Sequence, residues 1–264
     1  MEVPKQRRPH IVLVHGACHG AWCWFKLKPL LEAAGHHVTS LDLSASGIDP
    51  RSLNDVRTLA DYTAPLLEVM DSIPPNEKVV LVGHSLGGLN LAVAMDKYTE
   101  KIGVAVFLAA FMPDAKHRPS YVLDMYCERT PAEEWLDTEL LPIGTPEDPL
   151  TSMLFGPKFV SSKLYQLCPP QDVALANALL RSSSLFREDL CKKSPFTKEG
   201  FGSVKRIYVV CSQDKAIPKN FQLWQIENFG VDEVKEIENA DHMAMLSTPQ
   251  ELCQCLVEIT KKYA

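Results

Sequence analysis

The chain has 264 residues, long enough to bury a sizeable core, and its 46% hydrophobic and 23% charged content is ordinary for a globular protein. The formal net charge of -6 argues against a nucleic acid or an anionic membrane as partner. No apolar run approaches the roughly 20 residues of a membrane span, and the charged N-terminus does not resemble a signal peptide, so we expect a cytoplasmic location.

Short apolar runs typical of buried strands alternate with helical patterns along the chain. The predicted strands cover residues 11–14, 38–43, 79–82, 104–109, 207–211 and 234–237. The predicted helices cover residues 25–34, 59–72, 89–98, 221–229 and 249–262. Strands apolar enough to be covered on both faces, alternating with helices, indicate a mostly parallel sheet and an α/β fold class.

The alternation fails between residues 113 and 202, which are rich in proline, methionine and aromatic residues. We predict that residues 113–202 form a cap with helical segments, inserted into a core made of residues 1–112 and 203–264. An insertion there lies over the carboxyl ends of the strands, where open α/β sheets bind ligands.

A serine stands between two glycines where a predicted strand gives way to a predicted helix. Gly83-His84-Ser85-Leu86-Gly87 matches G-x-S-x-G in that context, which is typical of a nucleophile held on a sharp turn. The glycines leave room for a strained turn that presents the serine hydroxyl above the sheet. The alternative reading is a helix N-terminus that Ser85 only caps.

A serine nucleophile needs a histidine to accept its proton. In this fold the nucleophile, the acid and the histidine follow one another along the chain, which leaves His117 and His242 as candidates. We favour His242 because it lies in a predicted loop between the last strand and the last helix, whereas His117 lies at the start of the cap.

The histidine in turn needs an acid to orient it. Asp214 follows the strand at residues 207–211 and is the favoured candidate. Asp114 is the competitor, because some hydrolases carry the acid one strand earlier. Asp241 is disfavoured because neighbours in sequence seldom present their side chains to one another in this geometry.

Two backbone N–H groups must also stabilise the oxyanion. We predict that Leu86 and Ala17 supply them, with Gly16 keeping the approach free of side-chain bulk. His15 and His19 in the same loop could imitate metal ligands, but neutral, hydrogen-bonded histidines are the favoured reading and no metal is predicted.

Eight cysteines are scattered through the chain without a CxxC pair, so we expect reduced thiols. Cys253 and Cys255 are two residues apart in a helical pattern and cannot both face inward.

The motifs VLVHGACHGAW, LDLSASGI, VVLVGHSLGGLNLA, AVFLAAFMPD and ADHMAML together resemble the plant methylesterase and hydroxynitrile lyase group of α/β-hydrolases. Within that group the chain is most similar to salicylate-binding methyl-ester hydrolases. The resemblance implies a serine carboxylesterase that needs no cofactor and acts on methyl esters of small hormone-like acids. Its partners would be the ester and its acid product, and a homodimer is an open alternative to a monomer.

The resemblance also implies a substrate pocket formed by the cap and by loops of the core. Its candidate residues are Gly16, Phe111, Tyr126, Trp135, Met153, Phe155, Phe159, Leu185 and Met243. From the residues alone, such a set is more often ordinary core.

Two alternative functions remain open. Hydroxynitrile lyases of the group have threonine at the position of Gly16, glutamate-serine-cysteine at positions 84–86 and lysine at the position of Met243, so these residues favour the esterase. The other alternative is a hormone-binding signalling protein with little turnover.

Overall fold

The computed structural model describes residues 8–263. Six parallel strands form the central sheet, in the order β2-β1-β3-β4-β7-β8. They are β1 (His10–Val14), β2 (His37–Leu41), β3 (Val79–His84), β4 (Ile102–Leu108), β7 (Arg206–Cys211) and β8 (Glu233–Ile237). All six predicted strands are present, and the α/β fold class is confirmed.

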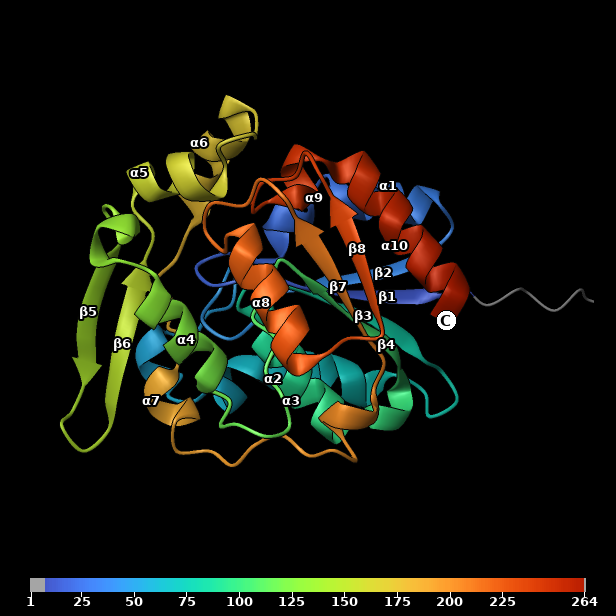
Figure 1. The fold of residues 1–264 in the computed structure, drawn as a ribbon, viewed down its shortest axis with the longest axis horizontal. Helices are drawn as coiled ribbons and strands as arrows, with labels where there is room; N and C mark the ends of the chain where they lie inside the picture. The colour runs from blue at the N-terminus through green and yellow to red at the C-terminus, as the bar shows by residue number, and fades with distance from the viewer. Residues whose placement is uncertain (1–7, 264) are drawn as a thin grey trace, which may run out of the picture.

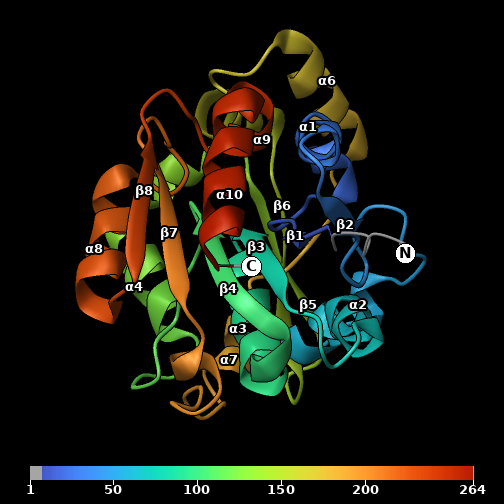
Figure 2. The same cartoon turned by 90° about the vertical axis from the view of Figure 1, so that its right-hand side faces the viewer.

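Helices cover both faces of this sheet, as Figure 1 shows with α1 and α10 above the strands and α2 and α3 below them. The helices of the core are α1 (Leu27–Ala33), α2 (Leu59–Ser72), α3 (Gly87–Lys97), α8 (Lys219–Phe229), α9 (Ala244–Ser247) and α10 (Pro249–Tyr263). Seen from the side in Figure 2, α8 and α2 lie at opposite edges of the sheet. The predicted helices therefore all occur, with small shifts at their ends.

Local sequence explains where these elements begin and end. At the start of α2 the Thr58 side chain accepts from the backbone N–H of Asp61, and the Asp61 carboxylate accepts from that of Thr58, which is a capping box. Strand β2 ends at Leu41, two residues earlier than predicted, because the backbone N–H of Leu43 donates to the His15 ring instead of continuing the ladder.

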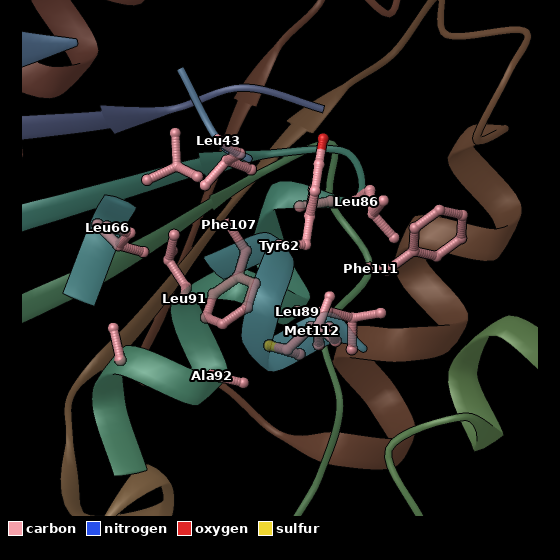
Figure 3. Packing of buried hydrophobic residues seen from close by; sticks show 14 of the residues in the cluster. Leu43, Tyr62, Leu66, Leu86, Leu89, Leu91, Ala92, Phe107, Phe111 and Met112 are labelled. Carbon is pink, nitrogen blue, oxygen red and sulfur yellow. The ribbon is translucent and has the colours of Figure 1, made fainter. Parts of the chain in front are cut away.

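Apolar side chains fill the space between the sheet and each helical layer. Figure 3 shows Phe107 of β4 close to Leu89 and Leu91 of α3, in one of the two buried clusters. On the other face Leu252 and Leu256 of α10 are fully buried against α1. Their spacing along α10 leaves Cys253 and Cys255 at its flanks, where each is half-buried.

The segment 113–202 contains α4 (Tyr121–Arg129), α5 (Pro157–Phe159), α6 (Pro170–Leu179) and α7 (Arg187–Leu190). It also contains an antiparallel hairpin, β5 (Glu139–Gly144) and β6 (Pro149–Leu154), which the sequence analysis does not predict. Figure 1 shows this hairpin at the end of the molecule opposite α10. Most of β5 is exposed on both faces, so its sequence lacks the alternation that marks a half-buried strand.

Within residues 8–263, no helix combines the length and the apolar character needed to cross a membrane.

Candidate active site

Ser85 lies on the turn between β3 and α3, with a φ of 56°. This left-handed conformation is strained for a non-glycine residue, and three backbone hydrogen bonds hold it. The Ser85 N–H donates to the Leu108 carbonyl (3.3 Å), and the Ser85 carbonyl accepts from the N–H groups of Phe111 (3.0 Å) and Gly88 (3.1 Å). A Cβ at Gly87 would lie 2.8 Å from the His15 carbonyl oxygen, so the turn can be this tight only with glycine there. The hydroxyl of Ser85 is thereby carried to the carboxyl end of the sheet.

His242 lies in the loop between β8 and α9, and Asp214 in the loop after β7. The Nδ1 of His242 is 2.7 Å from Oδ2 of Asp214, and both side chains are almost fully buried. The other oxygen of Asp214 accepts from the backbone N–H groups of Ala216 and Ile217, each at 2.8 Å. Because an ionised carboxylate only accepts, Nδ1 carries the proton and Nε2 of His242 is left as a lone pair.

Gln222 and Tyr126 support the loop that carries Asp214. The Gln222 side-chain amide donates to the carbonyl oxygens of Ile217 (2.7 Å) and Cys211 (3.1 Å). The Tyr126 hydroxyl donates to the Ala216 carbonyl (2.6 Å). Sequence reasoning missed Gln222, because its burial in α8 is visible only in the structure.

His84, next to Ser85 in sequence, holds the backbone of the loop that carries His242. Its Nε2–H donates to the His242 carbonyl oxygen (2.8 Å), and the two ring centroids are 4.4 Å apart. Burial, together with the neighbouring histidines, holds the pKa of His84 well below its usual value. His84 therefore stays neutral, and its support of His242 does not depend on pH in the range where histidines usually titrate.

The peptide group between Gly16 and Ala17 is oriented by His15. The Nε2 of His15 accepts from the Leu43 N–H (3.0 Å), and Nδ1–H donates to the Gly16 carbonyl oxygen (2.8 Å). Burial lowers the pKa of His15 to about 4, so the ring is neutral. In the described part of the chain, the N–H groups of Ala17 and Leu86 donate to no backbone carbonyl, and both residues line the same cavity as Ser85.

His19 links this loop to the segment 113–202. Its Nδ1–H donates to the Ala17 carbonyl (2.8 Å), and Nε2 accepts from the Tyr165 hydroxyl (2.7 Å). Burial lowers the pKa of His19 to about 3. The rings of His15 and His19 are thus both engaged by the chain itself, and among residues 8–263 no group of three potential metal-ligating side chains is found.

A small cavity joins these groups. From the core it is lined by Ala17, Ser85, Leu86, Phe111, Ala216, Ile217 and His242, and from the segment 113–202 by Tyr126, Trp135, Met153, Phe155, Phe159, Leu164 and Leu185. Seven of the nine residues predicted for the substrate pocket are among them. Sequence reasoning missed Leu164, Ala216 and Ile217.

The other two predicted pocket residues lie elsewhere. Gly16 lies close to Ser85, since an added Cβ would be 2.8 Å from the Cβ of Ser85. Met243 does not line the cavity: its side chain is fully buried in the cluster beneath α10. The backbone N–H of Met243 donates to Asp241, which turns the chain so that neighbouring His242, not Met243, faces the cavity. The difference from the lyases at position 243 therefore concerns a core position beside His242.

The competing residues have other partners. Asp114 is 2.7 Å from Nδ1 of His117, and neither lines the cavity. Burial raises the pKa of Asp114, but the backbone N–H groups of His117 and Lys116 and the His117 ring outweigh it, and the net shift is downward. Asp241 accepts from the Leu167 N–H (2.9 Å). All eight cysteines are free thiols.

The parallel sheet with a serine on the turn after β3 defines an α/β hydrolase. A family model described as "Alpha/beta hydrolase family" matches residues 11–254, and the chain belongs to that family.

Within this family the chain belongs to the plant methylesterase group and is a carboxylic ester hydrolase. It is 66% identical over 254 residues to "Salicylic acid-binding protein 2" of Nicotiana tabacum, covering 96% of this chain and 98% of that protein. It is 53% identical over 260 residues to "Methylesterase 1" of Arabidopsis thaliana, covering 98% of each chain. The crystal structure of polyneuridine aldehyde esterase superposes with a TM-score of 0.94 at 53% identity, covering 96% of this chain and 100% of that one.

Proposed function

We propose that the chain hydrolyses methyl esters of small, largely apolar carboxylic acids through an acyl-enzyme on Ser85. The observation that carries the proposal is the cavity that Ser85 and His242 both line, with Nδ1 of His242 2.7 Å from Oδ2 of Asp214. The names of the relatives, among them methylesterases, support a methyl ester as substrate.

In the proposed first half-reaction, Oγ of Ser85 attacks the ester carbonyl carbon while Nε2 of His242 takes the hydroxyl proton. The carbonyl oxygen becomes an oxyanion that accepts from the N–H groups of Ala17 and Leu86. Asp214 keeps the proton on Nδ1 and stabilises the imidazolium. When the intermediate collapses, the C–O bond to the alcohol breaks and His242 returns the proton to the leaving methoxide as methanol.

In the second half-reaction, water attacks the acyl-serine and gives a proton to His242. The bond to Oγ then breaks, Ser85 regains its proton, and the free acid leaves. His15 contributes by polarising the Gly16–Ala17 peptide: a hydrogen bond to its carbonyl strengthens the N–H on the other side of the same peptide.

The walls of the cavity favour a flat or slender apolar acid. Phe155 and Phe159 are stacked with ring centroids 5.0 Å apart, and Trp135 stacks on Phe159 at 6.1 Å. The name of the tobacco relative adds salicylate, an aromatic acid, as a candidate product that could remain bound. Both suggestions concern the same cavity.

One preparation assayed against methyl salicylate, methyl jasmonate, methyl indole-3-acetate and mandelonitrile tests the proposal. We expect turnover of at least one methyl ester, its loss in Ser85→Ala, and no cleavage of mandelonitrile. Cleavage of mandelonitrile without ester turnover would favour the lyase alternative. Tight salicylate binding without turnover of any ester would favour a binding protein.

A further inference from the structure

A second, larger cavity lies against the one that contains Ser85. Its volume is about 500 Å³, and it is bounded by α4, the β5–β6 hairpin and residues 184–188. Trp135, Met153 and Leu185 line both cavities. The two cavities are therefore adjacent, and these three side chains form the wall that they share.

The apolar character of the inner cavity continues into the outer one. The shared wall is Trp135, Met153 and Leu185, and Leu140 of β5 adds an apolar side chain that is 48% exposed. The exposed side chain of this leucine is in contact with water. A ligand bound against it would bury that apolar surface, which is favourable in free energy. The position of the hairpin thus extends an apolar surface outward from the site of ester hydrolysis.

The lining of the outer cavity also contains two charged residues, Arg187 and Glu188, which have different partners. Arg187 is neutralised by Asp124, with Nη2 2.8 Å from Oδ1. Glu188 meets a hydroxyl instead, since its Oε1 accepts from Oγ1 of Thr151 (2.6 Å). Arg187 and Glu188 both line the cavity, but the charge of Arg187 is offset by Asp124, so the carboxylate of Glu188 is the charge left without an ionic partner, which favours a hydrogen-bond donor over a carboxylate.

We propose that this outer cavity is a second subsite for the acid part of the ester, and that it takes acids with an extended apolar body ending in a hydroxyl or ammonium group. The methyl group of the ester needs little space, so the acid part is the portion that occupies the larger volume. This inference rests on the proposed function, because the ester carbonyl must lie at Ser85 for the acid to reach past Trp135.

The test compares a short and a long ester in three proteins. Ala132 lines the outer cavity and is exposed, so Ala132→Trp fills the cavity without disturbing a core; Glu133→Trp places the same side chain one residue further on, outside the lining. In the parent, kcat/KM should rise from methyl acetate to methyl decanoate by about two- to fourfold for each methylene that becomes buried. Ala132→Trp should reduce the long-to-short ratio at least tenfold, and Glu133→Trp should keep it. An unchanged ratio in Ala132→Trp overturns the proposal.

Equilibrium binding keeps the inference separate from catalysis. Calorimetry with ω-hydroxydecanoic acid, ω-aminodecanoic acid and decanedioic acid should give the weakest binding for the diacid, and Glu188→Gln should reduce the preference for the amino acid over the diacid by about threefold, as for a partly solvated charge pair. If no ester is turned over but Ala132→Trp weakens the binding of these acids, the proposed function fails, and the outer cavity is a binding site for such acids but not a subsite for an ester. If esters are hydrolysed but the acids bind equally to the parent and Ala132→Trp, the subsite fails alone.

Discussion

The core and the segment 113–202 both contribute apolar walls to one cavity, but the side chains of Ser85 and His242 come from the core alone. The core brings polar groups, each fixed by hydrogen bonds: His242 by Asp214 and His84, and the Ala17 peptide by His15. The segment 113–202 brings apolar walls, and its one hydroxyl, on Tyr126, is used to hold the loop of Asp214. From this difference we expect changes in the core to affect the reaction and changes in the segment 113–202 to affect which acid is accepted.

Removing the nucleophile should have the largest effect. Ser85→Ala deletes one oxygen and should lower kcat by about four to six decades for every ester, since all share the attack step. A change in the wall, Leu185→Ala, should instead alter the ranking of esters. Steady-state kinetics over an ester panel separates the two, and a Ser85→Ala protein within tenfold of the parent would contradict the role of Ser85.

The acid is the next most sensitive position, and the chain offers a matched control. Asp214→Asn should lower kcat about 10⁴-fold, because the amide favours the wrong tautomer of His242. Asp114 is also 2.7 Å from a histidine Nδ1, but outside the cavity, so Asp114→Asn should change kcat less than about twofold. The reverse ranking in a kcat comparison would assign the acid to the loop after β4.

A methyl group added at Gly16, next to Ser85, should change kcat more than KM. Gly16→Ala places a Cβ 2.8 Å from that of Ser85, which forces the turn to shift and should lower kcat about a hundredfold with a smaller change in KM. Gly202→Ala is the control, because its nearest neighbour would be 3.4 Å away. Equal kcat values for the two variants would mean that the turn accommodates the added carbon.

The smallest effect concerns stability in acid. The pKa of His19 is lowered to about 3 by burial, so the unfolded chain binds the proton first as pH falls below about 6.5. The free energy of unfolding is therefore highest near pH 7 and falls as the pH is lowered toward the pKa of the folded state. At pH 5 the loss is about 2 kcal/mol per such histidine. Urea unfolding at pH 7 and pH 5 measures this loss in the free energy of unfolding, which should be about 2 kcal/mol smaller in His19→Gln than in the parent. An equal loss in both proteins would show that His19 does not titrate on unfolding.

The two regions also differed in how far sequence could predict them. The inner strands β1, β3, β4 and β7 are apolar on both faces and Ser85 stands on a glycine-flanked turn, so their positions follow from local pattern. The β5–β6 hairpin was missed because most of its first strand is exposed on both faces and carries no alternation.

The omission of Gln222 and the incorrect placement of Met243 both depend on contacts that form only in the folded chain. Gln222 supports the Asp214 loop through contacts with Cys211 and Ile217 that no local pattern encodes. Met243 was assigned to the cavity through the resemblance, as the position where the lyases have lysine, but its backbone N–H donates to Asp241 and its side chain is buried in the core, outside the cavity. Two residues that are neighbours in sequence, His242 and Met243, therefore do not line the same cavity.

The central claim is that Ser85 is activated by His242 as a nucleophile. Incubation with a p-nitrophenyl alkylphosphonate, followed by peptide mass spectrometry, tests this directly, because the reagent forms a stable adduct on an activated serine. We predict one adduct per chain, on Ser85, with labelling at least a thousandfold slower in His242→Ala. Rapid labelling of another residue, or of Ser85 at an equal rate without His242, would contradict the account.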